Sequence, residues 1–149
     1  FPLQTVRYSL KPICSTRVSV RLSEAHEDDL ADKDCLIIDS FGLLSSIYRY
    51  GQIAYIGGGF GAGIHNTLEA AVYGMPVLFG PRYHKFKEAK DLIAVGGGFS
   101  ITDDSSFRTK MDELLTDPTA LETSGQAAGD FVKNSVGATD QILRQIHIR

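Results

Sequence analysis

The feature that most constrains this chain is a glycine-dense loop between two apolar segments, in the stretch IGGGFGAGIHNTLEAAVYGMPVLFGP at residues 56–81. Five glycines fall within the seven residues 57–63. A turn needs only one or two glycines, so this density indicates a backbone that passes close to a bound ligand. A flexible connection between a strand and a helix is the alternative interpretation.

Apolar strands and amphipathic helices alternate along the chain from residue 35 to residue 115. This order predicts an α/β fold, a Rossmann-like parallel sheet with helices on both faces and right-handed crossovers. Such sheets bind ligands beyond the carboxyl ends of their strands, where the glycine loop is expected. The expected strands are 5–10, 18–22, 35–40, 52–58, 76–81 and 98–102, and the expected helices are 40–50, 66–74, 85–95 and a C-terminal region ending near residue 146.

The composition is that of an ordinary soluble globular domain, with 149 residues, 43% hydrophobic and 22% charged. A net charge of -3 offers no basic field for nucleic acid. No apolar run approaches the ~18 residues that span a bilayer, and the start of the chain lacks the pattern of a signal peptide. Cys14 and Cys35 lack metal-ligand spacing and indicate free thiols in a reducing compartment. Because the chain begins at Phe1, without a Met, we interpret residues 1–149 as one domain of a longer protein.

The loop and the helix after it have the features of a phosphate site. Gly58 and Gly59 follow a strand, and Asn66 is expected to begin a helix whose first N–H groups lack partners. We expect both glycines to be needed for ligand approach more than for folding. Asn66 followed by Glu69 is also close to a capping box, which stabilises a helix start by ~1 kcal/mol without any ligand.

Two better-known phosphate motifs fit poorly. The relaxed G-x-G-x-x-A spacing of nicotinamide-cofactor sites is present, but the helix starts too late and no acidic residue ends the next strand. The lysine of a P-loop is absent from the sequence.

Ordered motifs across residues 39–88 resemble one known family. They are D-S-x-G-L-L…Y-x-x-x-x-I-A-Y-I-G-G, then I-G-G-G-F…G-x-H-N-x-L-E-A-A-x-x-G-x-P-V-L-F-G-P, then F-K-E. They are similar to motifs of the Kdo transferases, which attach 3-deoxy-D-manno-octulosonic acid (Kdo) to the lipid A precursor from CMP-Kdo. One position departs from the family, because Leu43 stands where an acidic residue usually follows the D-[ST]-x-G glycine.

The resemblance implies a GT-B glycosyltransferase, an enzyme of two Rossmann-like domains, with this chain as the C-terminal domain that binds the donor. The acceptor and the catalytic base would lie on the N-terminal domain, so we expect no catalytic residue here and no sugar transfer by the chain alone. The implied partners are CMP-Kdo, the lipid A precursor and that N-terminal domain, which alone would contact the membrane. The implied location is the cytoplasmic face of the inner membrane. Neither a metal nor a cofactor is implied beyond the donor substrate.

The resemblance also implies roles for residues around the loop. Asn66 and the helix start would bind the donor phosphate, and Glu69 would accept hydrogen bonds from the ribose hydroxyls. His65 is expected to contact ligand rather than to act as an acid or base, because no Asp or Ser is positioned to complete a triad. The predicted donor-binding residues are Ser40, Gly42, Gly58, Gly59, His65, Asn66, Thr67 and Glu69.

The remaining candidates have equally plain structural explanations. Arg82, Lys85 and Lys87, with His84 between them, follow strand 76–81 and would meet the donor's carboxylate, or form a solvated charged face. Ser40 would edge the site or cap helix 40–50, which Gly51 ends. The pair at 103–104 is expected to cap a helix rather than to bind a metal.

Two other functions remain open on the sequence alone. One is a GT-B glycosyltransferase or epimerase that uses a UDP-sugar, because a glycine loop and a ribose-binding glutamate recur there. The other is a non-catalytic nucleotide-sensing or interaction module. Nucleotide selectivity distinguishes the first from a Kdo transferase, and the absence of nucleotide affinity would indicate the second.

Overall fold

The computed structural model describes residues 19–26 and 33–135. The chain divides into two compact units, residues 1–50 and 51–149, which are described here one at a time. The predicted strand 5–10 and the predicted end of the C-terminal helix near residue 146 lie outside the described residues. The expectation of a single donor-binding domain stays a prediction.

The first unit contains a pair of parallel strands followed by a short helix. Strand β1 pairs in parallel with β2, with Ser19 opposite Cys35. Helix α1 begins at residue 44, four residues after the predicted cap, and its N-cap Leu43 makes no side-chain cap hydrogen bond. The prediction that Ser40 caps this helix is therefore wrong, because Gly42 has φ +85 and breaks the helical geometry between them. The elements are β1 (Ser19–Arg21), η1 (Leu22–Glu24), β2 (Cys35–Ile37), α1 (Leu44–Ile47) and η3 (Tyr48–Tyr50).

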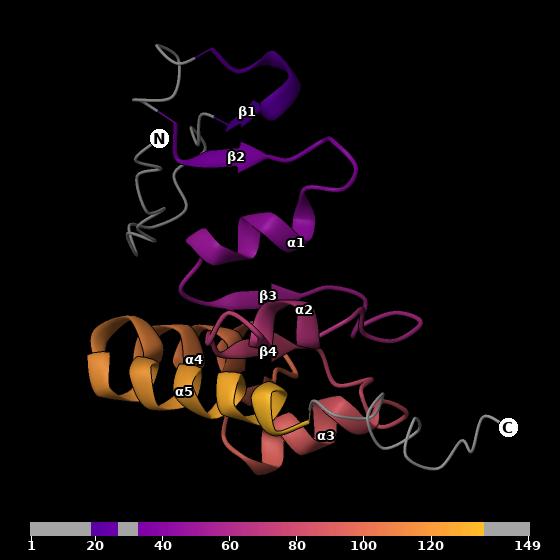
Figure 1. Ribbon diagram of the computed structural model, residues 1–149, viewed down its shortest axis with the longest axis vertical. Coiled ribbons are helices and arrows are strands. Elements are labelled where there is room, and N and C mark those ends of the chain that lie inside the picture. The colour runs from indigo at the N-terminus through magenta and orange to yellow at the C-terminus, as the bar shows by residue number, and fades with distance from the viewer. Residues whose placement is uncertain (1–18, 27–32, 136–149) are drawn as a thin grey trace, which may run out of the picture. The chain divides into compact units, whose positions relative to one another are not determined.

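The second unit, in its described residues 51–135, is a parallel sheet of strand order β3-β4-β5 with four helices (Figure 1). The strands are β3 (Ala54–Ile56), β4 (Val77–Phe79) and β5 (Gly98–Ser100), and the helices are α2 (Leu68–Ala71), α3 (Lys87–Ala94), α4 (Asp104–Thr116) and α5 (Pro118–Asn134). Each strand lies inside a predicted one. The parallel register, for example Val77 opposite Gly98, confirms the predicted α/β class.

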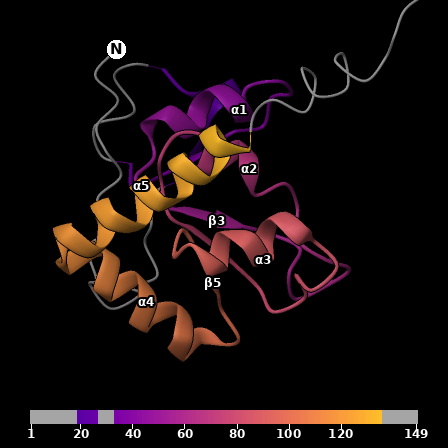
Figure 2. The same cartoon turned by 60° about the horizontal axis from the view of Figure 1, so that its bottom comes forward.

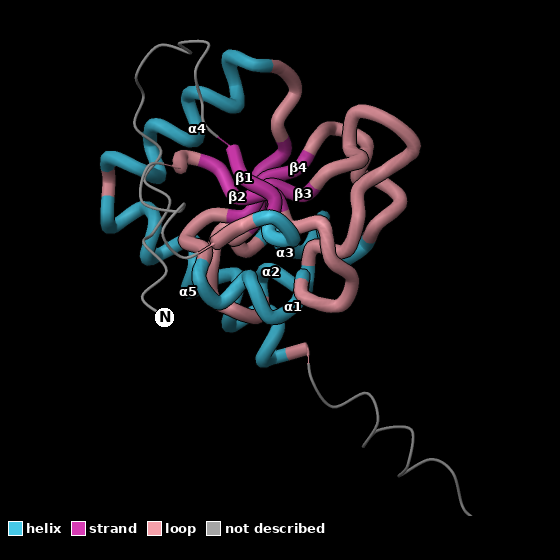
Figure 3. The backbone as a smooth tube through the Cα atoms, turned by 90° about the horizontal axis from the view of Figure 1, so that it is seen from above, coloured by secondary structure: helices cyan, strands magenta, loops and turns pink. Residues whose placement is uncertain are grey.

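Helices cover both faces of this sheet, as predicted (Figure 3). On one face, Leu78 and Phe99 pack with Met111 and Leu114 of α4. On the other, a Cβ added to Gly98 would lie 2.9 Å from the Leu92 Cβ, so α3 rests directly on the strand. Figure 2 shows α3 and α5 on this same side of the strands. Close packing on both faces buries the central strand β4 completely.

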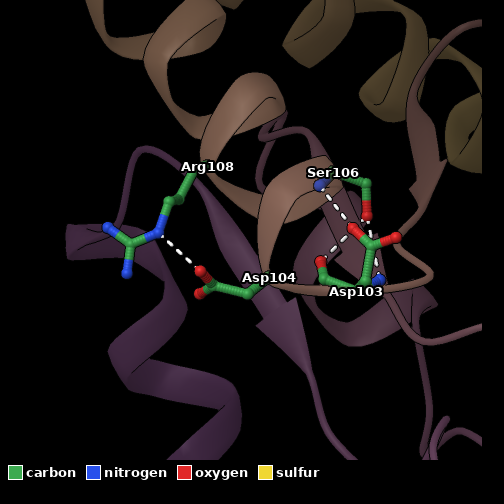
Figure 4. Close-up of polar contacts among 4 residues, drawn as sticks. All are labelled: Asp103, Asp104, Ser106 and Arg108. Carbon is green, nitrogen blue, oxygen red and sulfur yellow. Dashed lines mark hydrogen bonds and ion pairs between the residues drawn. The ribbon is translucent and has the colours of Figure 1, made fainter.

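The start of α4 carries the predicted helix cap (Figure 4). The Asp103 carboxylate accepts a hydrogen bond from the Ser106 backbone N–H at 2.7 Å, and the Ser106 hydroxyl oxygen accepts one from the Asp103 N–H at 3.0 Å. The Ser106 N–H and hydroxyl lower the pKa of Asp103. Asp104 forms an ion pair with Arg108 at 2.7 Å. Asp103 thus caps the N-terminus of α4, and Asp104 stabilises its first turn through the ion pair.

Candidate functional site

The glycine loop leaves the carboxyl end of β3 and folds back on itself. The Gly58 carbonyl accepts hydrogen bonds from the N–H groups of Gly61, at 2.8 Å, and Gly63, at 3.2 Å. The His65 N–H donates to the Gly57 carbonyl at 3.2 Å, which closes the loop at its base. The loop therefore lies at the sheet edge where α/β proteins bind ligands, as its sequence predicted.

Two of the loop glycines are required by the chain's own packing. Gly58 has φ +88, and a Cβ there would lie 2.2 Å from the Gly63 carbonyl oxygen. A Cβ on Gly59 would lie 2.5 Å from the backbone nitrogen of Gly80. No side chain fits at either position without a backbone shift. The packing therefore gives these glycines a role in folding, whereas their contact with a donor and the relative weight of the two roles stay predictions.

The segment after β4 packs against the glycine loop and forms hydrogen bonds to it. The Arg82 N–H donates to the Gly59 carbonyl at 2.9 Å, and the Arg82 guanidinium donates to the Gly61 carbonyl at 2.7 Å. The Phe86 ring lies 3.1 Å from the place of a Cβ on Gly63. Sequence reasoning did not find Gly80 and Phe86 as parts of this site, because nothing in a linear pattern says which glycine or ring lies under a loop.

The basic side chains that the sequence places after β4 have different partners in the structure. Arg82 is bonded to the loop, and Lys87 forms an ion pair with Asp91 one helical turn later. The His84 ring lies against the Tyr83 ring, tilted by 34° with 4.4 Å between ring centroids, and Lys85 is exposed. Contact of Arg82, Lys85 or Lys87 with a donor carboxylate stays a prediction.

The helix that was predicted for residues 66–74 is the single turn α2, Leu68–Ala71. It starts late because the Asn66 carboxamide oxygen accepts from the Leu68 N–H at 3.0 Å, a local turn that precedes the helix. It ends early because Gly74 has φ +71. One turn has little dipole, and Asn66 already occupies one of its free N–H groups, so the helix start is a weaker anion site than expected.

Asn66 also holds Glu69. The Asn66 amide nitrogen donates to the Glu69 carboxylate at 2.9 Å. This differs from a capping box, in which the carboxylate would accept from the Asn66 backbone N–H. No other described residue donates to the half-buried Glu69 side chain. The carboxylate is thus oriented at one oxygen and retains acceptor capacity for a ligand hydroxyl.

Thr67 lies in the core rather than on the loop surface. Thr67 is 1% exposed, and its hydroxyl has no hydrogen-bond partner among the described residues. The side chain is therefore not exposed on the loop surface, and contact of Thr67 with a donor stays a prediction. His65 and Asn66, its neighbours along the chain, are exposed.

Ser40 and Gly42 belong to the first unit, so they are described apart from the other predicted residues. Both are exposed, and a Cβ on Gly42 would meet nothing within 4 Å. The neighbouring Asp39 accepts from the Ser23 hydroxyl at 2.6 Å and from its N–H at 3.1 Å, and the hydroxyl bond is the main cause that lowers the Asp39 pKa. Asp39 of the D-S-x-G motif thus fixes the end of β2 to the segment after β1.

A shallow groove of about 660 Å³ runs along β5 and α4, and none of the predicted donor-binding residues lines it. No three His, Cys, Asp or Glu side chains of the described part group closely enough to hold a metal ion. Within the same part of the chain, no helix combines the length and apolar character needed to cross a membrane. The expectation that no metal or cofactor is used stays a prediction.

Comparison with known proteins gives a consistent result, although no protein-family profile matches the chain. A 3-deoxy-D-manno-octulosonic acid transferase of Aquifex aeolicus is 39% identical over 85 residues, which is 56% of this chain and 24% of the relative. One of Bordetella pertussis is 33% identical over 115 residues, which is 74% of this chain and 26% of the relative. The chain thus spans about a quarter of the length of these curated relatives.

A solved structure matches as well. The C-terminal CMP-Kdo binding domain of WaaA from Acinetobacter baumannii superposes with a TM-score of 0.66 and 27% identity, over 78% of this chain and 61% of that one. The names of the curated relatives and the matched fold agree with the family resemblance carried by the motifs of residues 39–88. The chain is therefore a relative of the 3-deoxy-D-manno-octulosonic acid transferases and has the α/β fold of the C-terminal domain of such a protein.

Proposed function

We propose that this chain is the donor-binding domain of a glycosyltransferase that moves Kdo from CMP-Kdo to a lipid A precursor. The observation that carries the proposal is the match of its fold to a domain described as CMP-Kdo binding. The position of Glu69 supports it, since a carboxylate oriented by Asn66 beside the glycine loop suits the hydroxyls of a ribose.

In the proposed reaction, an acceptor hydroxyl attacks the anomeric carbon of Kdo. A new carbon–oxygen bond forms as the bond to the phosphate oxygen breaks, and CMP leaves with the electron pair. The acceptor proton passes to a base on another domain. This chain holds CMP through Glu69 and the N–H groups of the loop, which stabilise charge on the departing phosphate. Neither metal nor cofactor takes part, and the reaction takes place at the cytoplasmic face of the inner membrane.

The test is calorimetric titration of the chain with CMP, UMP and UDP. We expect CMP to bind more tightly than either uridine nucleotide. Tighter binding of UDP would instead indicate an enzyme that uses a UDP-sugar, and no affinity for any of them would overturn donor binding.

Glu69→Gln examines the ribose contact. This change keeps the shape and one acceptor oxygen but removes charge-assisted hydrogen bonds worth ~1.5–3 kcal/mol each, so CMP affinity should fall at least ~10-fold. Glu122→Gln removes the same charge from an exposed position on α5 and should leave the affinity unchanged. A 2′,3′-dideoxy analogue should bind the parent weakly, with little further loss in Glu69→Gln. Equal CMP affinity of parent and variant would place the ribose elsewhere.

A further inference from the structure

The carbonyl groups of Gly58, Gly59 and Gly61 in the glycine loop accept hydrogen bonds from within the protein. Gly58 accepts from two loop N–H groups, and Gly59 and Gly61 both accept from Arg82. Because a trans peptide is planar, the N–H that follows each of these carbonyls points the opposite way. The N–H groups of Phe60 and Ala62 have no partner among the described residues. The Phe60 and Ala62 N–H groups therefore point to the side of their peptides that lies away from Arg82.

The orientation of the peptide between Gly61 and Ala62 depends on one side chain. The Arg82 guanidinium reaches across 21 residues of sequence to the Gly61 carbonyl at 2.7 Å. No other described donor bonds to this carbonyl. Glycines at 61 and 63 make the segment easy to rotate. Without Arg82, the peptide is free to turn its carbonyl oxygen outward.

We propose that Arg82 is a positioning residue that holds the Gly61–Ala62 peptide so that the Ala62 N–H faces the phosphate of the donor. The inference rests on the proposed function and adds to it the atom that meets the phosphate. A flipped peptide would present an oxygen to an anion and repel it, whereas the held peptide presents a hydrogen-bond donor. Arg82 thus acts through the loop and not through direct contact with the donor's carboxylate.

The first experiment needs no ligand. Amide hydrogen exchange, followed by NMR on the full chain, reports the order of residues 58–63 in the parent and in Arg82→Ala, Arg82→Gln and Lys90→Ala. Exchange in the loop should quicken about tenfold in Arg82→Ala and less in Arg82→Gln, whose amide still donates. Lys90→Ala removes the same charge from an exposed position on α3 and should change nothing in the loop. Unchanged loop exchange in Arg82→Ala would overturn the positioning role.

The second experiment compares CMP with cytidine, which lacks the phosphate. Arg82→Ala should weaken CMP binding about tenfold and leave cytidine binding unchanged, with partial recovery in Arg82→Gln. If Arg82→Ala disrupts the fold as a whole, the binding of CMP and of cytidine should weaken equally, and this result would overturn the proposal. CMP carries no Kdo carboxylate, so unchanged CMP affinity in Arg82→Ala also overturns it and leaves direct carboxylate contact as the role of Arg82. If the parent binds neither ligand, donor binding itself fails, while the exchange data still decide whether Arg82 holds the loop.

Discussion

Replacing Gly59 with alanine should destabilise the second unit, although the residue lies in a loop. The added Cβ would lie 2.5, 2.6 and 2.9 Å from the nitrogen, Cα and carbonyl carbon of Gly80. Contacts below 3.0 Å do not occur for real Cβ atoms, so a backbone must move. Gly80 directly follows the fully buried strand β4, which cannot shift without disturbing the core.

The size of the effect follows from that geometry. Overpacking by a single methyl group costs about 1–3 kcal/mol, and a contact with backbone atoms cannot be relieved by a change of rotamer. We therefore expect a loss of about 2–3 kcal/mol in unfolding free energy for Gly59→Ala. The matched control is Gly61→Ala in the same loop, where the nearest atom is 3.6 Å away and the backbone needs no positive φ. Its effect should stay within about 0.5 kcal/mol.

Urea denaturation followed by circular dichroism measures both variants against the parent. The midpoint should fall clearly for Gly59→Ala and remain close to the parent for Gly61→Ala. Equal midpoints for the two variants would refute the close approach of Gly59 to Gly80. An intact Gly59→Ala that loses only CMP affinity would favour the interpretation that the glycine makes room for a ligand.

The other predictions concern α4. Asp103 has a lowered pKa because Ser106 donates to its carboxylate, so its contribution to stability is present above the ordinary value of 3.8 and is lost as the pH falls through the lowered value. The stability difference between the parent and Asp103→Asn, measured by urea denaturation, should therefore shrink from neutral pH to acid pH, and a difference that does not change with pH would contradict this. Leu114 is 1% exposed, so Leu114→Ala should lower the free energy of unfolding by about 2–5 kcal/mol. Leu115 is 36% exposed, so Leu115→Ala should lower it by under about 1 kcal/mol. Equal losses in urea denaturation would contradict the assigned core.

The alternation of apolar segments predicted the fold class, and the observed strands begin and end inside the predicted ones. The predicted strand 76–81 is Val77–Phe79, and the next residue, Gly80, lies against the backbone of Gly59. The predicted helix 66–74 is shorter because Asn66 forms a local turn before it and Gly74, against which α5 packs its Gly125, has φ +71. Periodicity shows which residues are apolar but not where another segment stops an element.

The sequence by itself determined the order of the elements, the place of the glycine loop at the carboxyl end of a strand, and the likeness to Kdo transferases, because these depend on local patterns and ordered motifs. Only the tertiary structure decided what the residues of the loop do. Gly59 is a glycine because of Gly80, and Arg82 bonds to Gly61, at a sequence separation of 21 residues. Thr67 is buried in the core, whereas the residues before it, His65 and Asn66, are exposed. Such contacts arise when parallel pairing brings the ends of β3 and β4 to one edge, and no pattern read along the chain records which atoms then meet.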